Sequence, residues 1–184
     1  MLSKISDAYK RWRHTHGYGV HSPFAYNVVK GVVNPERIYA WYAYEDIDNA
    51  ISANSLPGSR SMARTLLRLA AFLDVHDAFL PNDDRTSPFR CALKGANSSM
   101  HISSALSDLG KCPLVCSVGD YVPLDRLKEI INTPGRTIAV RDIPESWPDE
   151  LFDALDEGLM LRGKRNVLVF HRDGMQKLSY TVRL

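Results

Sequence analysis

Adjacent polar and acidic residues follow the first predicted strand of this 184-residue chain, where a parallel sheet would bind a ligand. The turn from Leu80 to Thr86 holds Asn82, Asp83 and Asp84. Carboxylate and amide oxygens at such a turn could bind a cation or the amine of a ligand. The turn has no glycine, although a phosphate or carboxylate ligand needs glycines there so that backbone N–H groups can approach it. The same acids also suit a solvated turn, because negative charge stabilises the start of a following helix.

His21 stands immediately before a strong helix-start signal. Ser22 can cap the helix, Pro23 suits its first position and Phe24 can anchor it. These structural roles explain three of the four residues and leave His21 without one. Imidazole titrates near neutral pH, so His21 could act as a general base if this segment borders a substrate.

Composition and charge exclude several classes of protein. The net charge is +2, and 45% of the residues are hydrophobic and 24% charged, which is ordinary for a globular protein. The chain has no apolar run approaching the roughly 18 residues that a membrane helix needs, and no charged-then-apolar leader segment. We therefore expect a cytoplasmic protein without a membrane segment.

The cysteines fit a reducing compartment. There are three of them, Cys91, Cys112 and Cys116, and an odd count in largely apolar surroundings indicates reduced thiols. The spacing of Cys112 and Cys116 could suit a metal. No second Cys/His pair stands at zinc-site spacing, so we expect both thiols to pack in the core.

Residues 1–60 are predicted to form an N-terminal helical extension that ends in a linker at 54–59. Apolar residues recur at helical spacing from Leu2 to Trp12, and the basic residues of the first 30 positions outnumber the single acid, Asp7. No recognised nucleic-acid motif accompanies this charge, so we expect no nucleic-acid binding. The extension is expected to dock on the body or on another chain, and its helices could form a homo-oligomer.

Residues 61–184 are predicted to form an α/β domain, because short apolar runs alternate with helical patterns. The predicted strands cover 78–80, 100–102, 114–118, 137–140, 166–170 and 179–183. The predicted helices cover 62–73, 87–94, 104–109, 124–132 and 147–156. Because Arg172, Asp173 and Gly174 lie between the last two strands, we expect those strands to pair as an antiparallel hairpin at one sheet edge.

This order of elements resembles the class I S-adenosylmethionine-dependent methyltransferases, which end in an antiparallel pair of strands. Residues 17–26, with His-Ser-Pro-Phe after a basic helix, look like the entry segment of a bacterial branch of that superfamily. Residues 42–45 and the tail 166–184 look like the same branch. The resemblance implies an α/β fold: a Rossmann-like, methyltransferase-type three-layer sandwich with an antiparallel C-terminal hairpin and an N-terminal helical extension.

The resemblance also implies a cofactor site, from which this chain departs. S-adenosylmethionine would lie near Asn82, Asp83 and Asp120, with His21 or Asp120 as the catalytic base. Members of the superfamily carry an acidic-glycine motif where Leu80–Thr86 stands here. We therefore expect the cofactor to bind weakly or not at all.

The chain is one βα unit shorter than the superfamily pattern, and either the second or the third unit is missing. Superfamily members have an acid at the end of the second strand, where Ile102–Ser103 supplies none. In one register Asp120 follows the third strand; in the other it follows the fourth, and Asp142 follows the fifth. In the second register Asp120 and Asp142 would match two ligands of the divalent metal that catechol-type members hold. The third ligand position would be Ile143, so we expect no Mg²⁺ site.

Two functions follow from the sequence. In the first, the protein is a degenerate relative that kept the methyltransferase fold for a binding or assembly role. In the alternative, it is an active S-adenosylmethionine-dependent O-methyltransferase acting on a small molecule. We favour the first, because holding the cofactor needs close backbone approach and a ribose acceptor, and neither is evident in the sequence.

Overall fold

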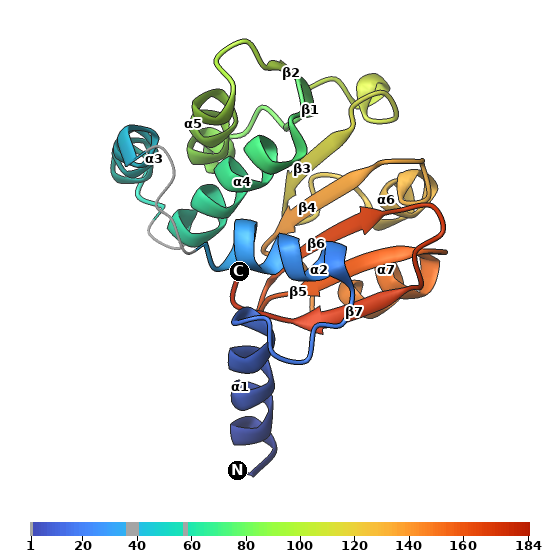
Figure 1. The fold of residues 1–184 in the computed structure, drawn as a ribbon. Helices are drawn as coiled ribbons and strands as arrows, with labels where there is room; N and C mark the ends of the chain where they lie inside the picture. Colours follow the sequence, from blue (N-terminus) through green and yellow to red (C-terminus); the bar gives the residue numbers. More distant parts are fainter. Residues whose placement is uncertain (1, 36–40, 57–58) are drawn as a thin grey trace.

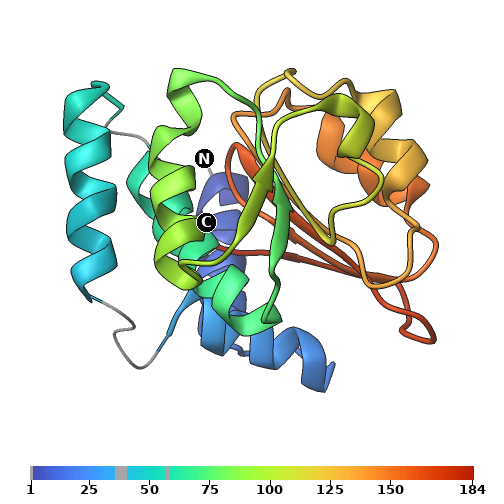
Figure 2. The same ribbon diagram turned by 90° about the horizontal axis from the view of Figure 1, so that it is seen from above.

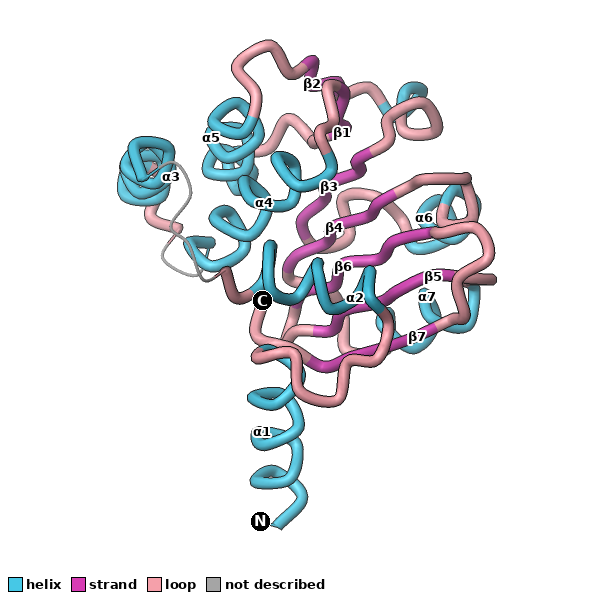
Figure 3. The backbone as a smooth tube through the Cα atoms, in the orientation of Figure 1, coloured by secondary structure: helices cyan, strands magenta, loops and turns pink. Residues whose placement is uncertain are grey.

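Seven strands form one mixed sheet in the order β2-β1-β3-β4-β6-β5-β7 (Figures 1 and 3). The computed structural model describes residues 2–35, 41–56 and 59–184. The first four strands of this order are parallel, β6 is antiparallel to both of its neighbours, and β7 is parallel to β5. The strands are β1 (Asp77–Phe79), β2 (His101–Ser103), β3 (Leu114–Val118), β4 (Thr137–Arg141), β5 (Gly158–Arg162), β6 (Asn166–His171) and β7 (Leu178–Thr181).

Helices cover both faces of the sheet, which gives an α/β fold consistent with a Rossmann-like sandwich (Figure 2). None of the helices in the described part of the chain is long and apolar enough to cross a membrane. The α-helices are α1 (Leu2–Thr15), α2 (Pro23–Val28), α3 (Trp41–Ala53), α4 (Arg60–Leu73), α5 (Ser87–Ala96), α6 (Leu124–Ile130) and α7 (Trp147–Ala154). Shorter turns of helix are η1 (Val29–Val33), η3 (Asp84–Thr86) and η4 (Leu106–Asp108).

Alternation along the strands separates two hydrophobic clusters, one on each face. In β3, Leu114, Cys116 and Val118 pack with α2 to α5, whereas Val115 packs with α6 and α7. Cys112 joins the second cluster, so it and Cys116 lie in clusters on opposite faces. Their expected place in the core is confirmed, and burial raises the pKa of both thiols.

The N-terminal segment packs on the same core as the strands. The Ser22 hydroxyl accepts a hydrogen bond from the Ala25 amide at 3.3 Å, which confirms the predicted start of α2. The Phe24 ring contacts that of Phe170 in β6, with 5.6 Å between centroids. In contrast, α1 projects from the body, as Figure 1 shows, and its last turn is attached where the Thr15 hydroxyl accepts a hydrogen bond from the Arg183 amide.

The predicted C-terminal hairpin was wrong in its pairing. Residues 166–170 do not pair with 179–183; β6 lies between β4 and β5, and β7 pairs with β5 in parallel. The antiparallel hairpin consists of β5 and β6, joined by the short turn 163–165. The sequence prediction left 158–162 unassigned, although its apolar run Leu159-Met160-Leu161 is suited to a strand buried on both faces.

Gly95, which was predicted to end the helix that begins at Ser87, lies inside α5, which continues to Ala96. A Cβ atom on Gly95 would lie 2.8 Å from the Ala43 Cβ of α3. The glycine therefore permits close contact between two helices and does not terminate one. The predicted helix over 104–109 is also shorter, since only the 3₁₀ turn η4 forms there.

Candidate functional site

The parallel strands β1, β3 and β4 end at one edge of the sheet, which we call the carboxyl edge. Asp83 follows β1, Asp120 follows β3 and Asp142 follows β4. All three carboxylates act on one cation, Arg85: its hydrogen bonds with Asp83 raise the guanidinium pKa most, and attraction to Asp120 and Asp142 adds to this. The structure thus brings three of the sequence-predicted site residues around an arginine to which no role was assigned.

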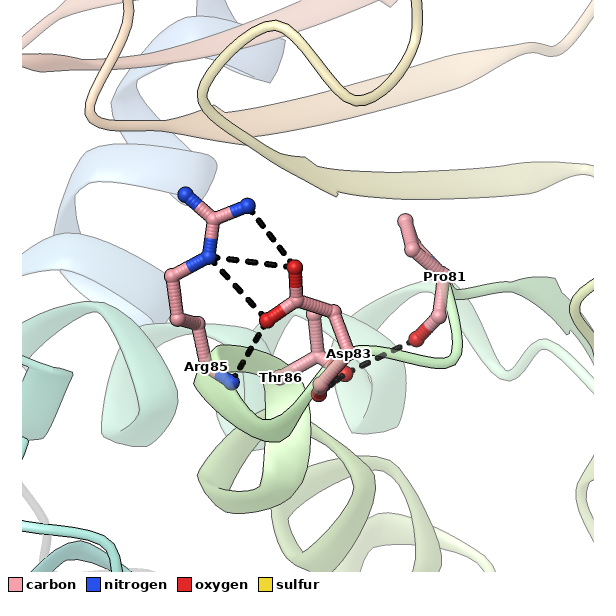
Figure 4. Close-up of polar contacts among 4 residues, drawn as sticks. All are labelled: Pro81, Asp83, Arg85 and Thr86. Atoms are coloured by element: carbon pink, nitrogen blue, oxygen red, sulfur yellow. Dashed lines mark hydrogen bonds and ion pairs between the residues drawn. The ribbon is translucent and has the colours of Figure 1, made fainter.

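Arg85 binds Asp83 through both its side chain and its backbone (Figure 4). Its Nε lies 3.0 and 3.1 Å from the two carboxylate oxygens, and its Nη2 lies 2.7 Å from Oδ2. The Arg85 amide also donates to Oδ1, at 2.8 Å. The guanidinium hydrogen bonds hold the pKa of the Asp83 carboxyl below its usual range. The Asp83 carboxylate is therefore neutralised within its own turn.

Backbone amides of the turn after β1 also donate hydrogen bonds within the protein. The Leu80 amide donates to a carbonyl of β2 at 2.9 Å, and the Thr86 amide donates to the Asp83 carbonyl at 2.9 Å. The buried Thr86 hydroxyl lies 2.8 Å from the Pro81 carbonyl, which fixes the turn from within (Figure 4). The amides of Leu80, Arg85 and Thr86 are thus already paired, and a phosphate or carboxylate ligand could bind them only by displacing those bonds.

Asn82 and Asp83 line a small polar hollow beside the start of α5. Its volume is about 280 Å³, below the roughly 300–1,000 Å³ of common ligand pockets, which are also predominantly apolar. The hollow is lined by Asn54, Asn82, Asp83, Asp84, Thr86, Ser87 and Arg90. Asp120 and Asp142 do not line it, so this hollow does not connect the three predicted positions.

A larger hollow, of about 780 Å³, is lined by α5 and the turn that follows it and by none of the sequence-predicted site residues. Asp46, Arg90, Cys91 and Lys94 are among its lining residues. Burial raises the pKa of the Cys91 thiol, so Cys91 is a weak nucleophile at neutral pH. Its position therefore does not indicate a reactive cysteine.

Asp142 is engaged by two further arginines. Its carboxylate oxygens lie 3.0 Å from the Nε of Arg141 and 3.4 Å from that of Arg165. Arg141 also donates to the buried hydroxyl of Ser59, the residue before α4. Burial lowers the pKa of Arg141, opposed by its attraction to Asp142. A cation at Asp142 would have to displace guanidinium groups, and the neighbouring Ile143 offers no ligand atom.

The acid nearest the end of β2 was missed by the sequence analysis. The Asp108 carboxylate, in η4, accepts a hydrogen bond from the Ser103 hydroxyl at 2.8 Å. Its other oxygen accepts one from Lys111, also at 2.8 Å. The only sequence signal for it is the short spacing between Ser103 and Asp108, and its carboxylate is already paired with a lysine.

The structure places His21 apart from the carboxyl edge. His21 is exposed and precedes α2, whose Phe24 packs against Phe170. Phe170 pairs with Thr137, the first residue of β4, so this part of α2 lies by the opposite end of the sheet. The two sequence-predicted catalytic residues, His21 and Asp120, are not brought together.

Comparisons with protein-family models, with curated proteins and with solved structures found no significant match for this chain. At the carboxyl edge, Asp83 and Asp142 form ion pairs with arginines of the same chain, and Asp120 is near enough to Arg85 for its charge to raise the guanidinium pKa.

Proposed function

We propose that this protein has a methyltransferase-type fold that no longer holds S-adenosylmethionine at its carboxyl edge and serves a binding or assembly role. The strand order supports the kinship. A common doubly wound order is 3-2-1-4-5-6, and β2-β1-β3-β4 corresponds to its 2-1-4-5 segment. We infer that the third βα unit of the superfamily pattern is absent from this chain, so that β3 and β4 correspond to the fourth and fifth strands of that pattern. Asp120 then follows the fourth strand of the pattern and Asp142 the fifth. The antiparallel hairpin of β5 and β6 beside β4 agrees with that kinship.

The pairing of Asp83 with Arg85 is the observation that carries the loss of cofactor binding. Ligands of open α/β sheets bind where the strand order reverses, which here is the crevice between β1 and β3. Gly119, directly after β3, borders that crevice: a Cβ atom placed on it would lie 3.7 Å from Arg85 Nη1. The guanidinium therefore extends from the turn after β1 toward the end of β3, into the region where a nucleoside would lie.

A calorimetric titration with S-adenosylhomocysteine, run beside a thermal-shift assay, tests whether cofactor binding has been lost. We expect neither heat of binding nor a rise in melting temperature at millimolar ligand. Saturable binding at micromolar concentration would raise the melting temperature by mass action and would restore the alternative, an active O-methyltransferase. Arg85→Ala removes the guanidinium from the region where a nucleoside would lie, so this variant tests whether Arg85 prevents binding. Arg126→Ala is its control, since Arg126 forms an exposed ion pair on α6.

The assembly role is assigned to an aromatic row on the projecting helix and the turn that follows it, formed by Tyr9, Trp12 and Tyr18. These side chains are 59%, 42% and 58% exposed. The Trp12 ring stacks on the other two, with centroids 6.2 and 6.0 Å apart. Exposed aromatic groups of this kind are enriched at protein interfaces. We propose that a second copy of the chain covers this row.

Sedimentation equilibrium tests the assembly role. We expect a concentration-dependent dimer that Trp12→Ala weakens and that Tyr121→Ala leaves intact, because Tyr121 is an exposed aromatic far from α1 in the sequence. A wild-type protein that stays monomeric at high concentration, or a dimer unaffected by Trp12→Ala, would contradict it.

A further inference from the structure

A histidine and two carboxylates converge at the opposite end of the sheet, the amino edge, where the parallel strands begin. Glu157 immediately precedes β5, His171 is the last residue of β6, and Asp173 lies in the turn toward β7. The antiparallel register pairs Gly158 with His171, which places Glu157 beside the imidazole. One potential ligand atom from each residue lies within 4.8 Å of the other two.

His171 is buried, and its Nδ1 has no hydrogen-bond partner among the described residues. The side chain is 5% exposed, and Nδ1 is inaccessible to solvent. The nearest acidic atom is Asp173 Oδ1 at 3.6 Å, beyond hydrogen-bonding distance. A buried polar atom without a partner is costly, and buried ring nitrogens are normally satisfied by a hydrogen bond or a metal. This nitrogen faces a carboxylate across a gap of the size that a shared ion would close.

The backbone around the group is held in place. Gly158 has φ +126°, and a Cβ atom there would lie 2.0 Å from the Phe170 carbonyl oxygen, so the chain approaches β6 more closely than any other residue would allow. Glu157 Oε2 accepts a hydrogen bond from the Gly174 amide at 2.7 Å, which ties the carboxylate to the turn before β7. The His171 amide donates to the Arg136 carbonyl at 2.9 Å.

No lysine or arginine of the described part of the chain forms an ion pair with either acid. The adjacent Arg172 points elsewhere, with its guanidinium 4.6 Å from the centroid of the Phe24 ring. Lys177 lies over the Phe152 ring, at 4.7 Å. The two carboxylates therefore keep the negative charge that would balance a divalent ion.

We propose that Glu157, His171 and Asp173 bind a divalent transition-metal ion of the Zn²⁺ type. An imidazole nitrogen favours such ions over Mg²⁺ and Ca²⁺, which prefer oxygen ligands alone. Three protein ligands leave a fourth position of a tetrahedral ion for water. The ion would link the residue before β5 to the end of β6 and the turn before β7, so its structural effect is to hold the edge strand β7 on the sheet.

The test is a calorimetric titration of the full chain with Zn²⁺, comparing the wild type with Asp173→Asn and Glu157→Gln. We expect one ion per chain and an affinity that falls about 10-fold or more in each variant. His101→Ala is the matched control, because His101 lies 3.4 Å from Asp77 in an exposed pair that no third ligand among the described residues completes. That control should bind Zn²⁺ as the wild type does.

A thermal-shift assay distinguishes lost binding from lost folding. Zn²⁺ should raise the melting temperature of the wild type and of His101→Ala but not of Asp173→Asn, whose exposed side chain can change without unfolding the protein. An excess of Mg²⁺ should not displace the ion. The proposal is overturned if the wild type shows no saturable Zn²⁺ binding, if the variants bind as tightly as the wild type, or if Mg²⁺ competes equally.

Discussion

Carboxylates gather at both edges of the sheet, but the two groups differ in whether arginines of the chain form ion pairs with them. At the carboxyl edge, Asp83 and Asp142 form ion pairs with guanidinium groups, and the charge of Asp120 helps to raise the pKa of Arg85. At the amino edge, Glu157 and Asp173 face the buried imidazole of His171. Acidic residues after strands are therefore a poor guide to a site by themselves, because nearby cations decide whether the charge is free to bind a ligand.

Strand direction explains why the two groups lie apart. The parallel strands place the residues that follow them at the carboxyl edge, and β6 runs the other way, so that its last residue reaches the amino edge. His171 is consequently separated from Asp142 by the length of a strand. We therefore expect that a substitution at one edge does not alter ligand binding at the other.

The largest expected effect is that of Gly158→Ala at the amino edge. The added Cβ would lie 2.0 Å from a backbone carbonyl, and the φ of +126° is strained for any other residue. We expect the free energy of unfolding, measured by urea titration, to fall by about 3 kcal/mol or more. Gly174→Ala is the control, since it has φ +72° but no atom within 4 Å of the new Cβ. Equal losses in the two variants would show that close contact at Gly158 does not matter.

Ser59→Ala should have the next largest effect, at the carboxyl edge. The hydroxyl is fully buried and accepts a hydrogen bond from Arg141, whose guanidinium is itself largely buried. Loss of a partner for a charged donor should lower the free energy of unfolding by about 1.5 kcal/mol. Ser52→Ala, which removes an exposed hydroxyl that donates within α3, should change it far less. A Ser59→Ala protein as stable as Ser52→Ala would contradict this assignment.

Asp83→Asn should cost less and should depend on pH. The pair with Arg85 is partly exposed, so we expect a loss of about 0.5 kcal/mol at neutral pH. The pKa of Asp83 is lower in the folded state than in the unfolded state, because Arg85 stabilises the ionised form. Its stabilising contribution is therefore complete above the unfolded pKa of about 4 and disappears as pH falls through the folded pKa. Urea titrations at neutral and acidic pH should show the difference between wild type and variant shrinking with acid; a constant difference would exclude an ionic origin.

The smallest expected effect is that of a substitution at the carboxyl edge on Zn²⁺ binding at the amino edge. Asp83→Asn should leave Zn²⁺ affinity within about 2-fold of the wild-type value, because Asp83 and the proposed zinc ligands share no partner in the described part of the chain and distant sites act additively. Calorimetry on the same preparations measures this. A large change would mean that the two edges are coupled and would break the comparison.

The buried strands β3 and β4 could be predicted from the sequence because each contains a short apolar run. The prediction for 114–118 coincides with β3, and that for 137–140 differs from β4 by one residue. The antiparallel partner β5 was missed because 158–162 follows a helix without a marked turn, and that omission caused the wrong hairpin. Pairing between strands is a long-range property that the local pattern does not specify.

The sites could be predicted only in part. The acids at 83, 120 and 142 could be placed after strands, but the neutralising role of Arg85 depends on the conformation of its turn. The group at the amino edge could not be predicted, since Glu157 meets His171 only through the register of a strand that was itself missed. Sequence spacing identifies residues on one element, whereas charge balance depends on how several elements meet.

Hydrogen exchange of the turn after β1, with and without S-adenosylhomocysteine, tests the central claim most directly. The amides of Leu80, Arg85 and Thr86 are paired within the protein, so we predict that millimolar ligand leaves their exchange rates unchanged. Slower exchange confined to this turn and to the segment after β3 would contradict the account, because it would show that the carboxyl edge binds the nucleoside despite Arg85.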